Sequence, residues 1–219
     1  MGELLTQQRY PVAELYALET YRAEVPPGYQ DRLTLVTPKE LGRISQLTTP
    51  HQVLAVVDLP EQTEELPEAV AQGWSLYLDG IQSPNNLGAL LRIADWFGFA
   101  YVFGGPGTAD LYSAKSIQAS MGSFLRVHYR ETTLDALTER FPTLPIFGAD
   151  LSGTSVYDLV PPPSGSLVIG TEGAGIRAGT QVKINRWLTI PRAPGRSAES
   201  LNAAVAAGIL CSALRRSGK

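Results

Sequence analysis

The chain has 219 residues, of which 44% are hydrophobic and 18% charged, the composition of a globular protein with room for a substantial core. Its longest apolar run, residues 203–214, falls well short of the roughly 20 residues that a helix needs to span a membrane, which argues against a membrane protein. One cysteine excludes an internal disulfide, and no basic and then apolar leader opens the chain, so a cytoplasmic protein is predicted.

The net charge of −3 is unevenly distributed along the chain. Residues 1–80 carry 5 Lys and Arg against 12 Asp and Glu, whereas residues 81–219 carry 13 against 9. A locally basic face inside an acidic protein suits a polyanionic partner, because phosphates respond to the nearby charges more than to the total. An ordinary solvated surface is the alternative. Five cations and no acid lie in 173–198: Arg177, Lys183, Arg186, Arg192 and Arg196.

The first 57 residues read as a small α/β N-terminal domain of short elements. Strands are predicted over 13–19, 33–37 and 53–59, with a short helix over 38–45. Residues 58–73 are acidic and contain two prolines, which predicts a linker before the main domain, 74–219.

The main domain alternates strands with helices. A buried strand over 74–80 is followed by Leu87, Leu90, Leu91 and Ala94 at i, i+3, i+4 and i+7, the period of an amphipathic helix capped by Asn85 or Asn86. This alternation predicts an α/β fold with a mostly parallel sheet, in which ligands bind at the carboxyl ends of the strands. Further strands are expected over 100–105, 124–129, 144–150, 167–170 and 187–191, and helices over 111–121, from Thr132 onward and over 198–215.

Three loops rich in polar residues and glycine fall at such strand ends, over 80–86, 170–176 and 191–200. The first presents Asn86 before a helix whose second turn carries Arg92; alone it indicates no more than a capped helix with a surface arginine. The second holds Glu172 among three glycines and matches neither a dinucleotide fingerprint nor a phosphate loop, so alone it is a plain turn.

The third loop leads into a helix of small residues. Ser197 is predicted to cap that helix, which leaves Ser200 and Asn202 without a capping role. Two histidines and one cysteine offer no ligand cluster, so no metal is predicted.

Taken in order, these segments resemble the SpoU/TrmH branch of the SPOUT RNA 2′-O-ribose methyltransferases. Its first motif is similar to Asn86-Leu-Gly88…Arg92, its second to the turn 170–173, and its third to Ile190-Pro191…Glu199-Ser200-Leu201-Asn202. QASMGSFLRV at 118–127 is also similar to the family. The resemblance covers about 74–215, and residues 1–57 resemble a shortened form of the substrate-recognition domain that many members carry.

The resemblance implies a sheet with a C-terminal trefoil knot, S-adenosyl-L-methionine as cofactor, an RNA substrate of the ribosomal or transfer class, and a homodimer through the knot and the C-terminal helix. The implied active site is Asn86, Arg92, Glu172, Ser200 and Asn202, and the implied cofactor site is Ala149, Gly170, Gly175, Ile190 and Leu201. The chain departs from the family pattern at Thr171, where Asn is usual, and in a longer 192–198 loop.

The chemistry of methyl transfer and the high pKa of guanidinium limit the roles that Arg92 can have. The sulfonium methyl is already activated, so the protein must align it with a ribose oxygen and help that oxygen lose its proton. Guanidinium has a pKa above about 12, so Arg92 is expected to bind the adjacent phosphate and stabilise the alkoxide rather than act as the base that the family assigns. A catalytically silent RNA-binding protein is the main alternative; a nucleotide-binding oxidoreductase lacks its phosphate loop here.

Overall fold

The computed structural model describes residues 1–7, 9–61 and 65–215. The chain divides into two compact units, Met1–Gln62 and Thr63–Lys219, and each is described by itself. The division falls inside the segment 58–73 that the sequence marks as a linker. Residues Leu66 and Val70 of that segment are buried in the core of the second unit, so the segment is not a linker throughout.

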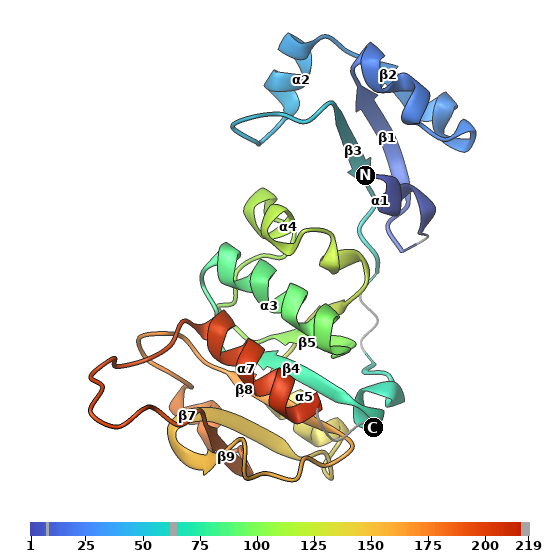
Figure 1. Ribbon diagram of the computed structural model, residues 1–219. Helices are drawn as coiled ribbons and strands as arrows, with labels where there is room; N and C mark the ends of the chain where they lie inside the picture. Colours follow the sequence, from blue (N-terminus) through green and yellow to red (C-terminus); the bar gives the residue numbers. More distant parts are fainter. Residues whose placement is uncertain (8, 62–64, 216–219) are drawn as a thin grey trace. The chain divides into compact units, whose positions relative to one another are not determined.

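The first unit is built on a three-stranded sheet in the order β2-β1-β3 (Figure 1). Strand β1 runs parallel to β2 and antiparallel to β3, and a small core forms around Leu5, Val12, Leu15 and Val25. The elements are α1 (Gly2–Thr6), β1 (Val12–Ala17), β2 (Leu33–Leu35), α2 (Pro38–Ile44), β3 (Val53–Val57) and the 3₁₀ helices η1 (Glu19–Glu24) and η2 (Pro27–Arg32).

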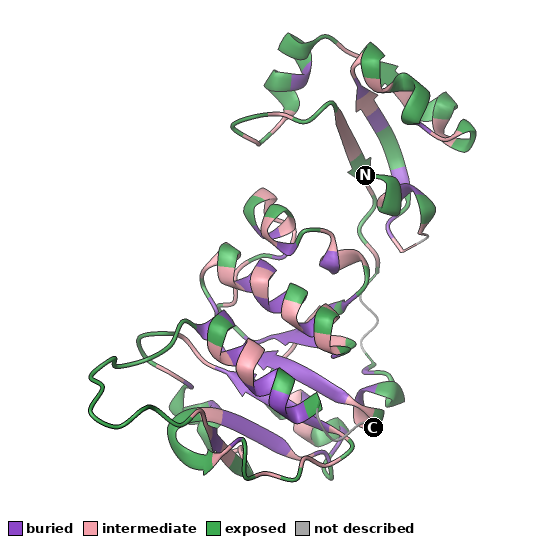
Figure 2. Ribbon diagram, in the orientation of Figure 1, coloured by how far each residue is buried: buried purple, intermediate pink, exposed green. Residues whose placement is uncertain are grey.

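The second unit holds a six-stranded sheet in the order β6-β5-β4-β8-β7-β9, and all five neighbouring pairs are parallel. The predicted mostly parallel sheet is confirmed. Every residue of the central strands β4 and β8 is buried, as expected for mostly apolar strands, and the polar Ser75 and Ser166 are buried with them. Figure 2 shows these strands as the buried centre of the sheet. The strands are β4 (Trp74–Leu78), β5 (Tyr101–Gly104), β6 (His128–Glu131), β7 (Ile146–Ser155), β8 (Gly165–Ile169) and β9 (Arg186–Thr189).

Helices cover both faces of this sheet. One core cluster joins Leu76 and Leu78 of β4 to helices α3 and α7, and a second joins Tyr77, whose side chain points the other way, to helix α5. The predicted face of α3, from Leu87 to Ala94, is fully buried. The helices are η3 (Glu68–Gln72), α3 (Pro84–Phe97), α4 (Ala114–Ser120), η4 (Ser123–Leu125), α5 (Leu134–Arg140), α6 (Ala178–Gln181) and α7 (Ala203–Arg215).

Two predicted helix starts are wrong. Helix α3 is capped by Ser83, whose Oγ accepts from Asn86 N, because Pro84 occupies the first helical position and fixes the start there. Helix α7 begins at Ala203 and not near 198, and the Asn202 side chain caps it by accepting from the backbone nitrogens of the second and third helical residues. Ser197 lies in the coil before it.

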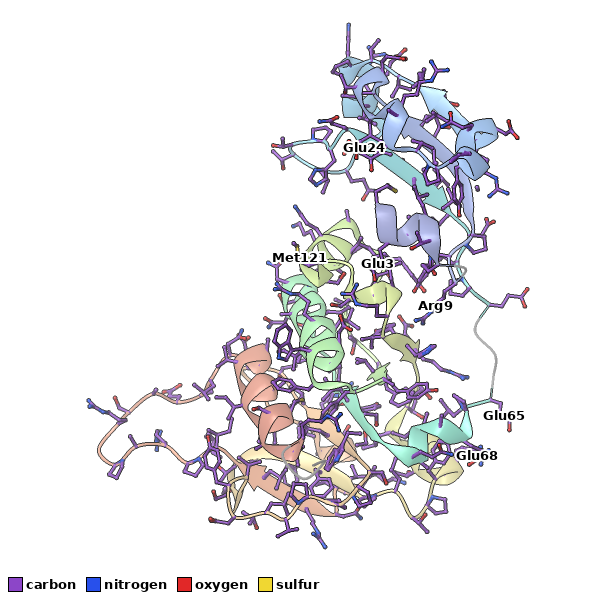
Figure 3. The ribbon with its side chains drawn as sticks, turned by 45° about the vertical axis from the view of Figure 1, so that its right-hand side comes forward. Glu3, Arg9, Glu24, Glu65, Glu68 and Met121 are labelled. Atoms are coloured by element: carbon purple, nitrogen blue, oxygen red, sulfur yellow. The ribbon has the colours of Figure 1, made fainter. Side chains whose placement is uncertain are left out.

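The strand predicted over 124–129 lies further along, at 128–131. Met121 and Gly122 both have positive φ, 49° and 88°, so the chain turns sharply after α4 and forms η4 before the strand begins. The Met121 side chain is 71% exposed at this turn (Figure 3). No helix among the described residues is long and apolar enough to cross a membrane.

Candidate active site

The three loops named above converge at one edge of the sheet. Strands β4, β8 and β9 are parallel members of the same sheet, so their carboxyl ends reach the same edge. The segment 79–86 follows β4, 170–177 follows β8, and 190–202 follows β9.

Glu172 is the point at which the three loops are joined. Its Oε1 accepts from Asn86 Nδ2 at 2.8 Å and also from Asn202 Nδ2. The backbone nitrogen of Ala203 approaches the same oxygen at 3.4 Å. Asn202 Nδ2 lies 3.2 Å from Asn86 Oδ1, which closes a three-membered polar cluster. We call Asn86, Glu172 and Asn202 the amide–carboxylate cluster.

The turn that presents Glu172 is closed by its own backbone. Thr171 and Gly175 exchange backbone hydrogen bonds of 3.0 and 2.9 Å, and Gly175 adopts a left-handed φ of 68°. A Cβ on Gly170 would lie 2.3 Å from the carbonyl carbon of Gly175, so only glycine fits there. Thr171 Oγ1 accepts from Ala174 N at 3.2 Å, so this residue holds the turn although the family usually has Asn here.

A buried ion pair holds the far end of that turn. The Asp79 side chain is 0% exposed, and its Oδ2 accepts from Arg177 N at 2.7 Å. Its Oδ1 accepts from Arg177 Nε at 2.9 Å, from Arg177 Nη2, and from Thr180 Oγ1 at 2.9 Å. Hydrogen bonding to this carboxylate raises the pKa of Arg177 above its ordinary value. Asp79 therefore ties the start of the first loop to the end of the second.

A cavity of about 550 Å³ opens beside the cluster. Two members of the cluster, Asn86 and Glu172, form part of its wall, as do both members of the buried ion pair. The other lining residues are Gly80, Ile81, Gln82, Ser83, Pro106, Gly107, Thr171, Gly173 and Ala174.

The residues implied for the cofactor lie on or after three adjacent strands, β7, β8 and β9. Ala149 is on β7, paired with Leu188 of β9, and Gly170 directly follows β8. Ile190 follows β9, and Gly175 closes the turn after β8. Leu201 precedes the Asn202 of the cluster and exposes 46% of its surface. None of these five residues lines the cavity described above.

Two residues implied for catalysis lie outside the cluster. Arg92 is exposed on α3, six positions and about 9 Å along the helix axis from Asn86. Within the described ranges, no hydrogen bond joins Arg92 to the cluster. Ser200 is exposed in the coil 190–202. No group of three or more metal-ligating side chains occurs in the part of the chain that the structure describes.

Sequence reasoning missed the pairing of Asp79 with Arg177. A polar residue directly after a buried strand was the available signal for Asp79, since strand ends are where α/β sheets bind ligands. Arg177 was noted only as one of five local cations. The 98 residues that separate the two hide their contact from any local pattern.

This fold and site define an α/β enzyme whose functional groups are held at the carboxyl ends of parallel strands. The model of the SpoU rRNA methylase family matches residues 73–212. The chain belongs to that family.

Known proteins similar to this chain extend the match beyond the family segment. The 23S rRNA (guanosine(2553)-2′-O)-methyltransferase RlmP of Bacillus subtilis (strain 168) is 33% identical over 184 residues, which is 83% of this chain and 71% of that protein. A putative RNA methyltransferase of the TrmH family from Porphyromonas gingivalis superposes with a TM-score of 0.86 at 38% identity, over 98% of this chain and 86% of that one. The SpoU methyltransferase AviRb from Streptomyces viridochromogenes, in complex with AdoMet, gives 0.78 at 25% identity, over 97% and 85%.

Proposed function

We propose that this protein transfers a methyl group from S-adenosyl-L-methionine to a ribose 2′-hydroxyl in structured RNA, ribosomal or transfer. The observation that carries the proposal is the amide–carboxylate cluster, in which one residue from each family motif meets at the strand ends. The named relative, RlmP, is a 2′-O-methyltransferase of 23S rRNA, and AviRb was solved with the same cofactor. An RNA substrate also suits the exposed Arg186, Arg192 and Arg196. Arg177 and Lys183 pair with Asp79 and Asp135. We expect the protein in the cytoplasm.

The chain fits the cofactor. Gly170, directly after β8, and Ala149, within the neighbouring β7, present backbone with little side chain. Leu201 exposes an apolar surface that a purine ring would cover. We therefore assign Ala149, Gly170, Gly175, Ile190 and Leu201 to the cofactor site. S-adenosylmethionine, when bound there, supplies an already activated methyl group.

The cluster itself works by holding geometry. The nitrogen and the oxygen of the Asn86 side chain already bond to Glu172 and Asn202. The main role of Asn86 is therefore to align the loops. Ser200 is exposed and lies two residues before Asn202 of the cluster. Its hydroxyl would orient the ribose hydroxyl. Arg92 would bind the neighbouring phosphate and stabilise the alkoxide, because a guanidinium does not deprotonate at working pH.

A second copy of the chain would bring Arg92 to the site. On α3, Arg92 and Trp96 are one turn apart on an exposed face, and Trp96 is 84% exposed. Val205 on α7 is 52% exposed, and a shallow hollow lies between Phe97 and Ile209 of the same two helices. An apolar face of this kind indicates a protein interface. We propose that a homodimer covers it, so that each site combines one copy's cluster with the partner copy's arginine.

We also propose the trefoil knot of the family. The segment 190–202 leaves β9, yet Asn202 bonds Glu172 at the end of β8, and β7 lies between those strands in the sheet. The chain must therefore pass back across the end of β7. Residues 1–57 would help to recognise the RNA, as a shortened substrate-recognition domain.

The activity is tested by transfer of tritiated methyl groups from S-adenosylmethionine to separated total RNAs of a strain lacking the gene, followed by mapping of the modified nucleotide. Incorporation at one nucleotide, as a 2′-O-methyl group, is expected. Binding of both RNA and cofactor without any incorporation would instead support the catalytically silent alternative.

Subunit mixing tests the shared site. Arg92→Ala and Asn202→Ala are each expected to be inactive as homodimers. Random mixing would restore about one quarter of wild-type turnover, because half of the dimers are mixed and each mixed dimer keeps one intact site. No recovery on mixing would place Arg92 and Asn202 of one site on the same chain.

A further inference from the structure

The cavity beside the cluster has no assigned ligand. It shares Asn86 and Glu172 with the cluster but includes none of the five residues assigned to the cofactor. Its volume of about 550 Å³ falls within the range typical of small-molecule sites. A space that adjoins the cluster and contains none of the residues assigned to the donor is open to the RNA nucleotide.

Arg177 is held rigidly in the wall of this cavity. Its Nε, Nη2 and backbone nitrogen all donate to Asp79, whose side chain is 0% exposed, yet the Arg177 side chain remains 45% exposed. Nη1 takes no part in these bonds to Asp79. The outer edge of the guanidinium is therefore fixed in direction and presents donors only.

The rest of the wall combines apolar and polar groups. Ile81, Pro106 and Ala174 contribute apolar surface, and Gly80 lies against the guanidinium, since a Cβ there would be 3.7 Å from Arg177 Cζ. Gln82 lines the cavity and is exposed, so its amide can pair with a second polar edge. The remaining side chains of the wall are polar: Asp79, Ser83, Asn86, Thr171 and Glu172. Apolar contacts together with hydrogen-bonding groups at fixed places orient a ligand.

We propose that this cavity receives the base of the nucleotide to be methylated, turned out of its stack, and that the base is guanine read by Arg177. This inference rests on the proposed function. Guanine presents two adjacent acceptors on its major-groove edge, O6 and N7, which a donor-only fork matches. Adenine places a donor beside its N7, and uracil has a donor between its two oxygens. Cytosine has two adjacent acceptors, N3 and O2, only on its pairing edge, so the identity of the methylated nucleoside decides between guanine and cytosine. Turning a base out of the helix exposes this edge together with its ribose.

The experiment uses the full-length protein and the RNA identified by methyl transfer. The modified RNA is digested and its nucleosides are identified, and 2′-O-methylguanosine is expected. A transcript carrying 7-deazaguanosine at the target then lacks the N7 acceptor. Wild-type kcat/KM for that transcript is expected to fall about 10-fold relative to guanosine, which is the effect of losing one bond of a bidentate pair.

A variant separates base reading from a structural role. Arg177→Lys cannot form a planar fork, so it is expected to be slower on both transcripts and to discriminate between them less than about 2-fold. A purely structural role of Arg177 would slow both but keep the 10-fold discrimination. Arg140→Lys is the matched control: Arg140 also pairs with a carboxylate, Glu68, away from the cavity, and should keep the wild-type ratio (Figure 3 labels Glu68).

Wild-type measurements alone can overturn the inference. Methylation of an adenosine, cytidine or uridine, or equal rates on guanosine and 7-deazaguanosine, would refute guanine reading and leave the proposed function standing. Absence of methyl transfer to any RNA would refute the proposed function, and the inference with it.

Discussion

Replacing Glu172 by alanine tests whether the three loops are held together by this side chain. The substitution removes an acceptor that takes hydrogen bonds from Asn86 Nδ2 at 2.8 Å, from Asn202 Nδ2, and from Ala203 N at 3.4 Å. The two asparagine side chains then lose the atom that aligns them. Because the site is exposed, water can replace that acceptor, and the main loss is order in the loops.

The magnitude follows from these contacts. Hydrogen bonds to a charged group contribute about 1.5–3 kcal/mol each where water is excluded. Glu172 is exposed, so about 1 kcal/mol for each of the two side-chain bonds is the more realistic figure, and the long backbone contact adds little. A loss of about 2 kcal/mol in the alignment of the transition state corresponds to a roughly 30-fold fall in kcat.

Steady-state methyl transfer measures the effect on kcat and KM, and thermal unfolding measures the effect on stability. The kcat of Glu172→Ala is expected to fall roughly 30-fold or more. Its KM for RNA is expected to stay the same or decrease, because a negative charge is removed near the phosphates. The Tm should change by less than about 4 °C, since the bonds lie at the surface.

Glu139→Ala, an exposed carboxylate on α5, is the matched control and should keep full turnover. A Glu172→Ala enzyme with wild-type kcat would refute the view that the cluster aligns the loops.

Three further substitutions or measurements address the fold. Asp79→Asn weakens the buried ion pair with Arg177, whose side chain is about half exposed. The free energy of unfolding should therefore fall by about 2 kcal/mol, and the Tm measured by calorimetry by about 4–8 °C. An unchanged Tm would contradict the role of Asp79 as a fixed anchor. Gly88→Ala would place a methyl group 2.4 Å from a side chain of α4, so the free energy of unfolding in urea should fall by about 1–3 kcal/mol. Gly179→Ala, with nothing within 4 Å of the new methyl group, should leave it unchanged. Equal effects of the two substitutions would show that α3 and α4 can move apart. Burial raises the pKa of the Cys211 thiol, so the folded protein should resist thiol reagents at pH 8. The free energy of unfolding should decline only as the pH rises above about 8.5, the pKa of the thiol in the unfolded chain. Rapid labelling of the native protein would count against this prediction.

The sequence was sufficient for the central strands and for the buried face of α3, because the pattern of apolar residues reports burial directly. The mostly apolar strands at 74–78 and 165–169 are buried throughout, Ser75 and Ser166 included. The helix face from Leu87 to Ala94 is buried as its spacing predicts. Helix starts were predicted less well, because several neighbouring side chains can cap and only the backbone path selects among them. Pro84 settled the start of α3 in favour of Ser83, a local signal that outweighed the two asparagines.

The site was predictable in part for a similar reason. The motifs identified Asn86, Glu172 and Asn202, and the structure brings these three together. The contact between Asp79 and Arg177 depends on the order of strands in the sheet, which places the end of β4 beside the end of β8. No local pattern contains that information, so the residue that anchors the Glu172 turn emerged only from the structure.

Asn202 shows why the active site and the last helix form together. Its Oδ1 caps α7 by accepting from Ala204 N at 3.0 Å and Val205 N at 3.2 Å, while its Nδ2 donates to Glu172. A cap at Ser197 would have left the asparagine side chain inside a helix, with its Oδ1 unavailable to fix the direction of Nδ2. Because one side chain satisfies the helix start with its oxygen and the cluster with its nitrogen, the start of α7 and the closure of the three loops depend on the same residue. The enzyme therefore completes its site only when the C-terminal segment is in place.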